Sequence, residues 1–129
     1  KMGIRFCVIK NDKTKLPVSR SSIVQVLVNI LINATHVMPH GGQLDVSIET
    51  LGDTLFLRIH DYGPGIPKNI MDKIFDPFFT TKGDHGTGIG LAICREIIEI
   101  EHAGRITATN HSSKGAEFII ELPLKAESL

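Results

Sequence analysis

The sequence predicts an α+β fold, a two-layer α/β sandwich in which helices pack on one face of a mixed, mostly antiparallel sheet. Segments of alternating apolar and polar residues, typical of strands, stand among two long segments with the composition and end signals of helices. The two kinds of segment do not alternate regularly, which argues against a parallel sheet covered on both faces. Hydrophobic residues form 42% of the 129 residues, so we expect one domain with its own core over residues 1–129.

End signals and alternation place the individual elements along the chain. Serines open the first long helix, and Pro39 with the glycine pair that soon follows ends it. Gly52-Asp53 between two alternating segments is a strong hairpin signal. Apolar side chains surround nearly the whole first helix, so we expect it to be buried. The expected elements are a strand over 1–9, a helix over 19–38, strands over 43–51 and 54–60, a short helix over 68–75, a helix over 88–102, and strands over 106–110 and 116–122.

The charge balance excludes some classes of partner. The 14 basic and 14 acidic side chains cancel, so the chain has no overall attraction to nucleic acid or to an anionic membrane, and a local site must hold any anionic ligand. No apolar run reaches membrane-spanning length and no signal peptide opens the chain. We therefore expect a cytoplasmic domain, excised from a parent protein with or without a membrane tether. Cys7 and Cys94 are expected to be reduced thiols.

Polar residues form a stripe on the first long helix. At about 100° per residue, Ser22, Gln25, Asn29, Asn33 and His36 fall within an arc of roughly 80°. Two interpretations stay open. The amides bond to neighbouring backbone, since buried amides need partners, or they face a polar ligand. An Asn oxygen suits Mg²⁺ without adding a full charge near phosphates.

A turn rich in glycine and proline, Asp61-Tyr62-Gly63-Pro64-Gly65-Ile66-Pro67, directly follows an apolar strand. It is either an ordinary turn closed by an Asp side-chain bond or a stiff recognition loop. The glycines allow close backbone approach, and the prolines stiffen the loop. A carboxylate here would accept a hydrogen bond from the exocyclic amine of adenine and would repel the carbonyl oxygen of guanine.

An aromatic segment and a glycine-rich loop follow. Residues 74–82 hold three of the six phenylalanines, and residues 83–91 lead into the second long helix. Free N–H groups at a helix start favour an anion, and Lys82 adds a point charge. The alternative is a flexible surface loop with Phe75 and Phe78 packed in the core. The loop is neither a dinucleotide fingerprint nor a Walker A loop.

Together these segments resemble the catalytic, ATP-binding domain of sensor histidine kinases, in the GHKL superfamily shared with gyrase B-type, chaperone and mismatch-repair ATPases. Residues 29–34, NILINA, are similar to its N box, and residues 61–66, DYGPGI, to its first glycine box. Residues 75–82, FDPFFTTK, resemble the F box, which separates histidine kinases from the other ATPases. Residues 86–91, GTGIGL, resemble the second glycine box, and Gly115-Ala116-Glu117-Phe118 a weaker third one. The resemblance implies the Bergerat ATP-binding fold.

The resemblance also implies ATP and Mg²⁺ as ligands and a role for each matching residue. Asn33 would hold Mg²⁺ with Asn29 beside it, Asp61 would bond the adenine amine, and Lys82 would reach the phosphates. Phe75 and Phe78 would anchor a lid over residues 80–87, and its glycines would hinge it and offer N–H groups to phosphate. Asn29, Asn33 and Lys82 would be the catalytic residues. The nucleotide-contacting set is Asn29, Asn33, His36, Asp61, Gly63, Gly65, Ile66, Phe75, Phe78, Thr81, Lys82, Gly86, Thr87, Gly88, Gly90 and Leu91.

Two departures from the family pattern stand out. Many members carry a phosphate-contacting Lys where this chain has His36, so the role of that residue is open. The common His-Gly-Gly after the second long helix is His102-Ala103-Gly104 here, which indicates a packing change.

The resemblance implies a kinase that transfers the γ-phosphoryl of ATP to a histidine on a separate helical dimerisation domain, upstream in the parent protein. A response regulator receiver domain would be the downstream partner. No histidine here lies in the acceptor motif, so we expect this chain alone not to autophosphorylate. A nucleotide-binding regulatory module without transfer activity is one alternative, and Asn33, Asp61 and the glycines argue against it. An anti-sigma-type serine kinase is the other, and the F box argues against it.

Overall fold

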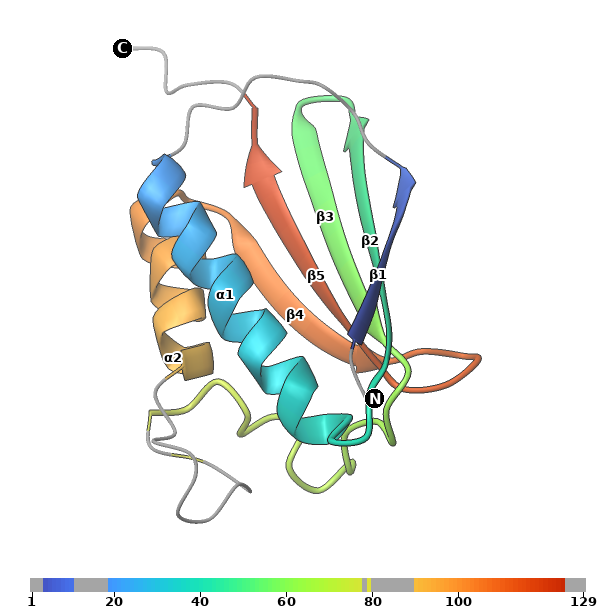
Figure 1. Ribbon diagram of the computed structural model, residues 1–129. Coiled ribbons are helices and arrows are strands. Elements are labelled where there is room, and N and C mark those ends of the chain that lie inside the picture. Colours follow the sequence, from blue (N-terminus) through green and yellow to red (C-terminus); the bar gives the residue numbers. More distant parts are fainter. Residues whose placement is uncertain (1–3, 11–18, 78, 80–89, 125–129) are drawn as a thin grey trace, which may run out of the picture.

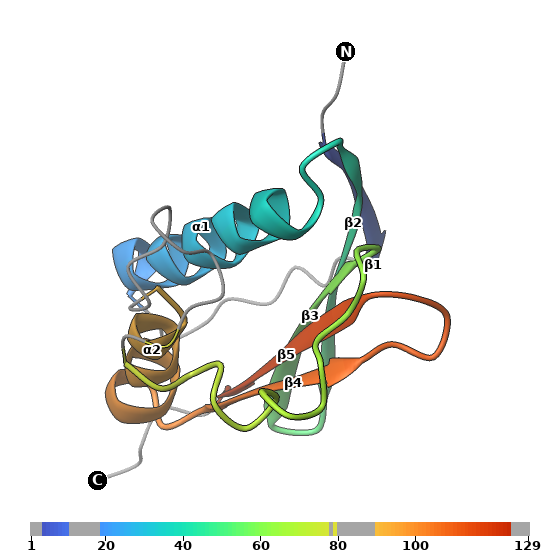
Figure 2. The same ribbon diagram turned by 90° about the horizontal axis from the view of Figure 1, so that it is seen from below.

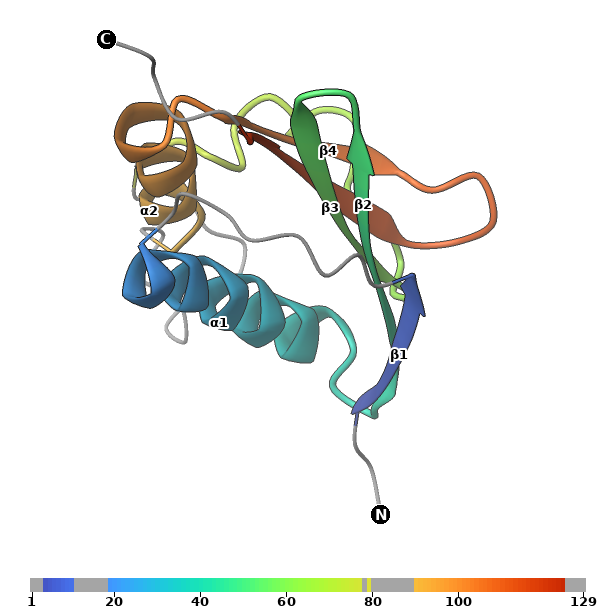
Figure 3. The ribbon, with the colours of Figure 1, turned by 90° about the horizontal axis from the view of Figure 1, so that it is seen from above.

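The computed structural model describes residues 4–10, 19–77, 79 and 90–124. Two layers are present, a sheet and a pair of helical segments that cover one of its faces (Figures 1, 2 and 3). No helix among these described residues is long and apolar enough to cross a membrane. The elements are β1 (Ile4–Lys10), α1 (Arg20–Val37), β2 (Gly42–Leu51), β3 (Thr54–Asp61), α2 (Gly90–Arg95), the π-helical η2 (Glu96–Glu101), β4 (Arg105–Asn110) and β5 (Ala116–Pro123).

The sheet is mixed and mostly antiparallel, as the sequence predicts. Its five strands run in the order β1-β2-β3-β5-β4. Only β1 pairs in parallel, with β2, and the other three pairs are antiparallel. The expected hairpin between β2 and β3 closes on the pair Leu51 and Thr54, with Gly52 at φ +61°.

The core lies between the sheet and the helices. Alternate residues of the two central strands point into it, which is the period-two pattern of a half-buried sheet. Helix α1 contributes residues one turn apart, and η2 adds a further pair. These buried residues are Leu55, Leu57 and Ile59 of β3, Phe118, Ile120 and Leu122 of β5, Val26, Ile30 and Ala34 of α1, and Ile97 and Ile98 of η2.

Helix α1 begins and ends where expected, but the expectation that it is buried all round is wrong. Ser19 caps it, accepting a hydrogen bond from the backbone N–H of Ser22 at 3.4 Å. Val24, Val28 and Ile32 follow one another at helical spacing and are 44–50% exposed. The helix packs on the sheet and on the second helical segment, and no other helix or strand of the described residues covers its outer side (Figure 3).

The expected short helix over 68–75 is also wrong. This segment is a chain of tight turns in which Ile70 N donates to Pro67 O, Lys73 N to Ile70 O, and Asp76 N to Lys73 O at 2.8–3.1 Å. Each bond reaches back three residues, as in 3₁₀ turns, rather than the four of an α-helix. The stretch is short, which makes an α-helix marginal, and Pro77 prevents a helix from continuing beyond it.

The second long helix, expected over 88–102, is α-helical only at its start. Its described part begins at Gly90, since residues 88 and 89 lie outside the described range, and it widens into η2 after six residues. It ends with Ala103 at φ +54°, while Gly104 N donates to Ile98 O at 2.8 Å. A helix commonly ends on one left-handed residue, usually glycine, so Ala103 occupies a position that strains it.

Ala103→Gly should therefore raise the free energy of unfolding by about 0.5–1 kcal/mol, because the left-handed strain disappears while the freer unfolded glycine offsets part of the gain. Urea denaturation measures the difference. Gly52→Ala is the matched control, because Gly52 has φ +61° with open space around an added Cβ and should lose a comparable amount. Equal or lower stability of Ala103→Gly would show that Ala103 carries no strain.

Candidate functional site

The carboxylate of Asp61 lies at the end of β3, on the core face of the sheet. It continues the buried alternation of that strand and is only 5% exposed. Its Oδ1 accepts hydrogen bonds from Gly63 N at 2.9 Å and from Ala116 N, the first residue of β5, at 3.2 Å. Within the described residues both bonds of this carboxylate go to Oδ1. Asp61 thus closes an ordinary turn and still keeps a second oxygen for a ligand.

The turn after Asp61 lies against the carboxyl end of α1 (Figure 1). A Cβ on Gly63 would lie 3.3 Å from both Cγ2 and O of Val37 and 3.2 Å from Asp61 Oδ1. Gly65 has φ +87°, a conformation that favours glycine. Both glycines therefore serve the close packing of the turn.

A cleft of about 390 Å³ opens beside this turn. Its volume is within the usual range for small-molecule sites. The lining is mostly apolar, and the turn after Asp61 supplies one wall. The lining residues are Val37, Pro64, Gly65, Ile66, Pro67 and Ile70.

The two asparagines of the polar stripe have different surroundings. Asn29 Nδ2 donates to Gly90 O, at the start of α2, at 3.2 Å. Burial raises the pKa of the neighbouring Cys94 thiol to about 11, and a hydrogen bond with Asn29 opposes that rise. Asn33 is half-buried, and its side-chain amide has no hydrogen bond partner among the described residues. Asn29 therefore agrees with the interpretation that the amides of the stripe bond to neighbouring backbone. The side-chain amide of Asn33 is left for another partner.

Helical spacing fixes how these residues relate to the cleft. Asn29, Asn33 and Val37 are four residues apart, so they follow one line on α1, about 6 Å per step. Asn29 contacts α2 at one end of this line, and Val37 contacts the Asp61 turn at the other. Asn33 stands between the two, facing the space between α2 and the cleft.

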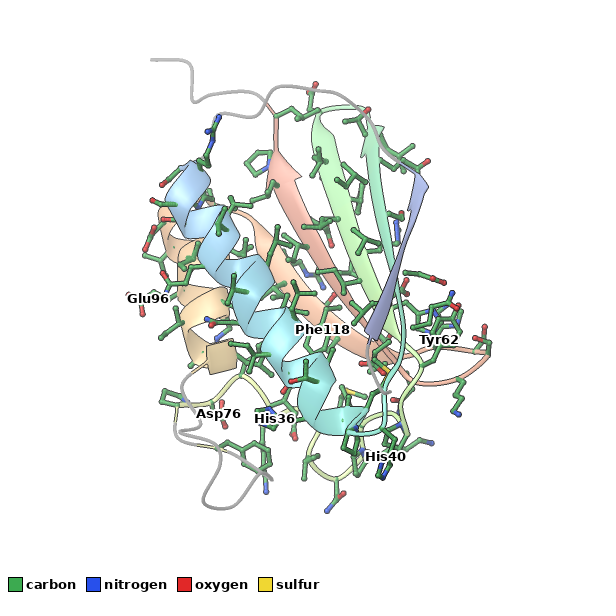
Figure 4. The ribbon with its side chains drawn as sticks, viewed as in Figure 1. His36, His40, Tyr62, Asp76, Glu96 and Phe118 are labelled. Atoms are coloured by element: carbon green, nitrogen blue, oxygen red, sulfur yellow. The ribbon has the colours of Figure 1, made fainter. Side chains whose placement is uncertain are left out.

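The rest of the stripe turns away from the cleft. Ser22 Oγ donates to Glu101 Oε1 at 3.2 Å, which joins the start of α1 to the end of η2. Gln25 is exposed. His36 is exposed on the carboxyl-terminal half of α1, where Figure 4 shows it.

The aromatic segment contributes to the core. Phe75 is half-buried and packs edge-on against Phe118, with ring centroids 6.3 Å apart and an interplanar angle of 88°. Phe79 also packs against the buried core. Leu91, the second residue of α2, does the same. The remaining residues expected at the phosphates and the lid, Phe78, Thr81, Lys82, Gly86, Thr87 and Gly88, lie outside the described residues.

A polar cluster that was not predicted from the sequence lies on the opposite face of the sheet, behind Asp61. Tyr62, which is labelled in Figure 4, donates its hydroxyl to Asp45 Oδ2 at 2.5 Å. The rings of His60 and His111 stack with centroids 3.7 Å apart. Partial burial alone raises the pKa of Asp45. Hydrogen bonds from Tyr62 and Gln43 and the nearby imidazoles outweigh it, and the pKa is lowered. The cluster holds His60 and Tyr62, the residues on either side of Asp61. In the sequence, only the alternation of strand side chains indicates that these two residues share a face.

Several known proteins share this arrangement. The family described as histidine kinase-, DNA gyrase B-, and HSP90-like ATPase matches residues 19–126. Sporulation kinase C of Bacillus subtilis (strain 168) is 34% identical over 122 residues, which cover 95% of this chain and 26% of that protein. Sensor histidine kinase ZraS of Salmonella typhimurium is 41% identical over 105 residues, which cover 81% of this chain and 22% of that protein. The chain thus spans about a quarter of the length of these curated relatives.

The fold is also similar to that of solved structures. The catalytic domain of histidine kinase ThkA matches with a TM-score of 0.85 and 39% identity, over 95% of this chain and 82% of that chain. The mycobacterial sensor histidine kinase MprB matches with a TM-score of 0.82 and 27% identity, over 96% of this chain and 84% of that chain. ThkA in complex with response regulator protein TrrA matches with a TM-score of 0.79 and 35% identity, over 95% of this chain and 34% of that chain.

These matches confirm the predicted Bergerat fold, since the solved neighbours are histidine kinase domains with the same arrangement of sheet and helices. The family match extends over most of the chain, including α1, the Asp61 turn and the last two strands. The chain therefore belongs to the histidine kinase-, DNA gyrase B- and HSP90-like ATPase family.

Proposed function

We propose that this chain is the ATP-binding catalytic domain of a sensor histidine kinase, which transfers the γ-phosphoryl of ATP to a histidine on a separate helical dimerisation domain. The observation that carries the proposal is the buried carboxylate of Asp61, which has one oxygen held by two backbone N–H groups and begins the turn whose later residues, Pro64 to Pro67, line an apolar cleft. A fixed acceptor beside an apolar slot is the chemistry that recognises adenine.

Asp61 acts as the base-recognition residue in this proposal. The bonds from Gly63 and Ala116 hold Oδ1 and prevent the carboxylate from rotating, so Oδ2 has a fixed direction. It accepts a hydrogen bond from the adenine amine, while the walls at Ile66 and Val37 cover the ring. Guanine would place a carbonyl oxygen there, and two acceptors repel each other.

The polar line on α1 serves the metal. The proposed protein ligand is the side-chain oxygen of Asn33 on this line. Asn33 fits Mg²⁺, a hard cation that prefers oxygen and takes its other ligands from phosphates and water. Bound Mg²⁺ would neutralise charge on the phosphates. Asn29 orients the start of α2 beside it through Gly90.

We further propose that the expected loop completes the phosphate site. Lys82 supplies the positive charge, and Thr81, Gly86, Thr87 and Gly88 supply hydroxyl and backbone donors. His36, exposed near Asn33, offers a further donor to phosphate. Phe75, packed on Phe118, anchors the start of the loop.

The relatives favour transfer over other uses of the fold. Sporulation kinase C and sensor histidine kinase ZraS are named as kinases, and histidine kinase ThkA is solved in complex with a response regulator protein. By that likeness we propose a response regulator receiver domain as downstream partner and a cytoplasmic setting. A phosphoryl-transfer experiment distinguishes this proposal from its two alternatives, a nucleotide-binding regulatory module without transfer activity and an anti-sigma-type serine kinase.

Asp61→Asn should weaken ATP binding by about 100-fold, because the amide keeps an oxygen for Gly63 and Ala116 but turns its NH₂ toward the adenine amine. Calorimetric titration with ATP and GTP measures this, and the wild-type protein should strongly prefer ATP. Asp53→Asn, on the exposed β2–β3 turn, is the matched control and should bind as the wild type does. Equal wild-type affinity for the two nucleotides would remove Asp61 from base recognition.

Asn33→Ala should abolish most of the enhancement of ATP binding by Mg²⁺, while adenosine binding stays within about twofold of the wild type. The reason is that Asn33 touches the metal, whereas the base is held one helical turn away beside Val37. Titrations with and without Mg²⁺ give the enhancement as a ratio. Asn69→Ala, at an exposed position, controls for loss of an amide. An unchanged ratio in Asn33→Ala would mean that another group binds the metal.

The chain alone should bind ATP but neither label itself nor hydrolyse ATP at a useful rate. The superfamily ATPases carry a Glu one turn before the Mg²⁺-binding Asn, and Asn29 stands there and cannot accept a proton at neutral pH. Adding the parent's helical domain should produce label on its histidine from γ-labelled ATP. Rapid phosphate release without that domain would indicate an ATPase, and label on serine would favour the serine kinase.

A further inference from the structure

The side chain of Asn110 binds the wall of the cleft. Asn110 is the last residue of β4, and its amide makes two hydrogen bonds to one residue, Ile66. Its Oδ1 accepts from Ile66 N at 2.7 Å, and its Nδ2 donates to Ile66 O at 2.9 Å. Two facing residues of an antiparallel pair make the same two N–H···O bonds through their backbones. Here a side chain makes both bonds, to a residue 44 positions away in the sequence.

The strand residue paired with Asn110 binds Asp61, at the other end of the turn. Asn110 pairs with Ala116 in the register of β4 and β5, and Ala116 N donates to Asp61 Oδ1. The hairpin between them is closed by His111 N, which donates to Gly115 O at 2.8 Å. One pair of facing residues therefore fixes both Asp61, which begins the turn, and Ile66, which ends it.

Two glycines make room for this double attachment. A Cβ on Gly65 would lie 2.8 Å from Asn110 Oδ1, so Gly65 admits the amide as well as adopting its positive φ. A Cβ on Gly115, at φ +81°, would strike the backbone carbonyl of Asp61 and lie 2.9 Å from its Oδ1. A larger residue at either position would push the turn away from the hairpin.

We propose that Asn110 is a positioning residue for base recognition: it sets the distance between the Asp61 acceptor and the apolar wall at Ile66. The proposal rests on the assignment of the cleft as the adenine site. An amide is required, because only a group with one donor and one acceptor side by side satisfies both Ile66 N and Ile66 O. An ionised Asp of the same shape would accept from Ile66 N and repel Ile66 O.

Asn110→Asp is the decisive variant because it changes the chemistry and keeps the shape. At pH 8 its adenosine affinity should fall about tenfold, since the wall at Ile66 is released. The ratio of ATP to GTP affinity should fall with it, while the ratio of ATP affinities with and without Mg²⁺ stays at the wild-type value. Ser112→Asp places the same charge on the exposed hairpin two residues away and should leave adenosine binding unchanged.

The pH profile separates positioning from general weakening. As the pH falls toward 4, close to the ordinary aspartate pKa of about 3.9, about half of the new carboxyl groups become protonated, and the hydroxyl can again donate to Ile66 O while the carbonyl accepts from Ile66 N. Adenosine affinity of Asn110→Asp should therefore recover toward the wild type on the acid side. Asp61, His60, His111 and Glu117, the nearby titratable groups, are common to both proteins, so the wild-type profile is the reference. Wild-type affinity at every pH, or no recovery in acid, would overturn the proposal.

Two further measurements keep the result interpretable. Thermal unfolding checks that each variant is folded. If Asn110→Asp is not, Asn110→Ser takes its place, and adenosine affinity and ATP-to-GTP selectivity equal to the wild type would overturn the proposal. Asp61→Asn is titrated in parallel. If it binds adenosine as the wild type does, the adenine assignment itself fails. If it loses binding while Asn110→Asp does not, only the role of Asn110 fails.

Discussion

The arrangement at the site depends on one interaction, the pair of backbone hydrogen bonds that Asp61 Oδ1 accepts from Gly63 and Ala116. A charged group this buried is costly unless it is hydrogen-bonded. Two N–H groups offset that cost on one oxygen and leave the other oxygen for a partner. The bonds also join the end of β3 to the start of β5, so the local turn and the long-range sheet register support each other.

Register decides which face of β3 carries the site. Leu55, Leu57, Ile59 and Asp61 share the core face, and a slip of one residue would turn His60 inward instead. The intervening residues His60 and Tyr62 then lie on the opposite face, where Asp45 and His111 hold them. The acceptor thus lies between an apolar core and a polar brace on the other side of the same strand.

The elements that follow from local chemistry could be predicted from the sequence. Alternation gave the strands, a capping serine gave the start of α1, and Gly52 gave the hairpin, because each of these signals acts within a few residues. The exposed face of α1 could not be predicted, because an apolar surface does not reveal how many layers will cover it. The same holds for Ala103, whose left-handed conformation follows from the widened turn of η2 before it. Asn110 had no local signal, since its partner Ile66 is brought to it by the sheet.

The two halves of the proposed site stand on different elements. The proposed base recognition would depend on β3, β4 and β5, through Asp61, Ile66 and the hairpin, whereas the proposed metal ligand Asn33 stands on α1. The two meet where Val37 packs against Gly63. Because Val37 is four residues beyond Asn33, the spacing between the proposed base and metal sites would be set by the helix, at about 6 Å, and by one close backbone contact. A rigid helix would hold that spacing better than a loop would.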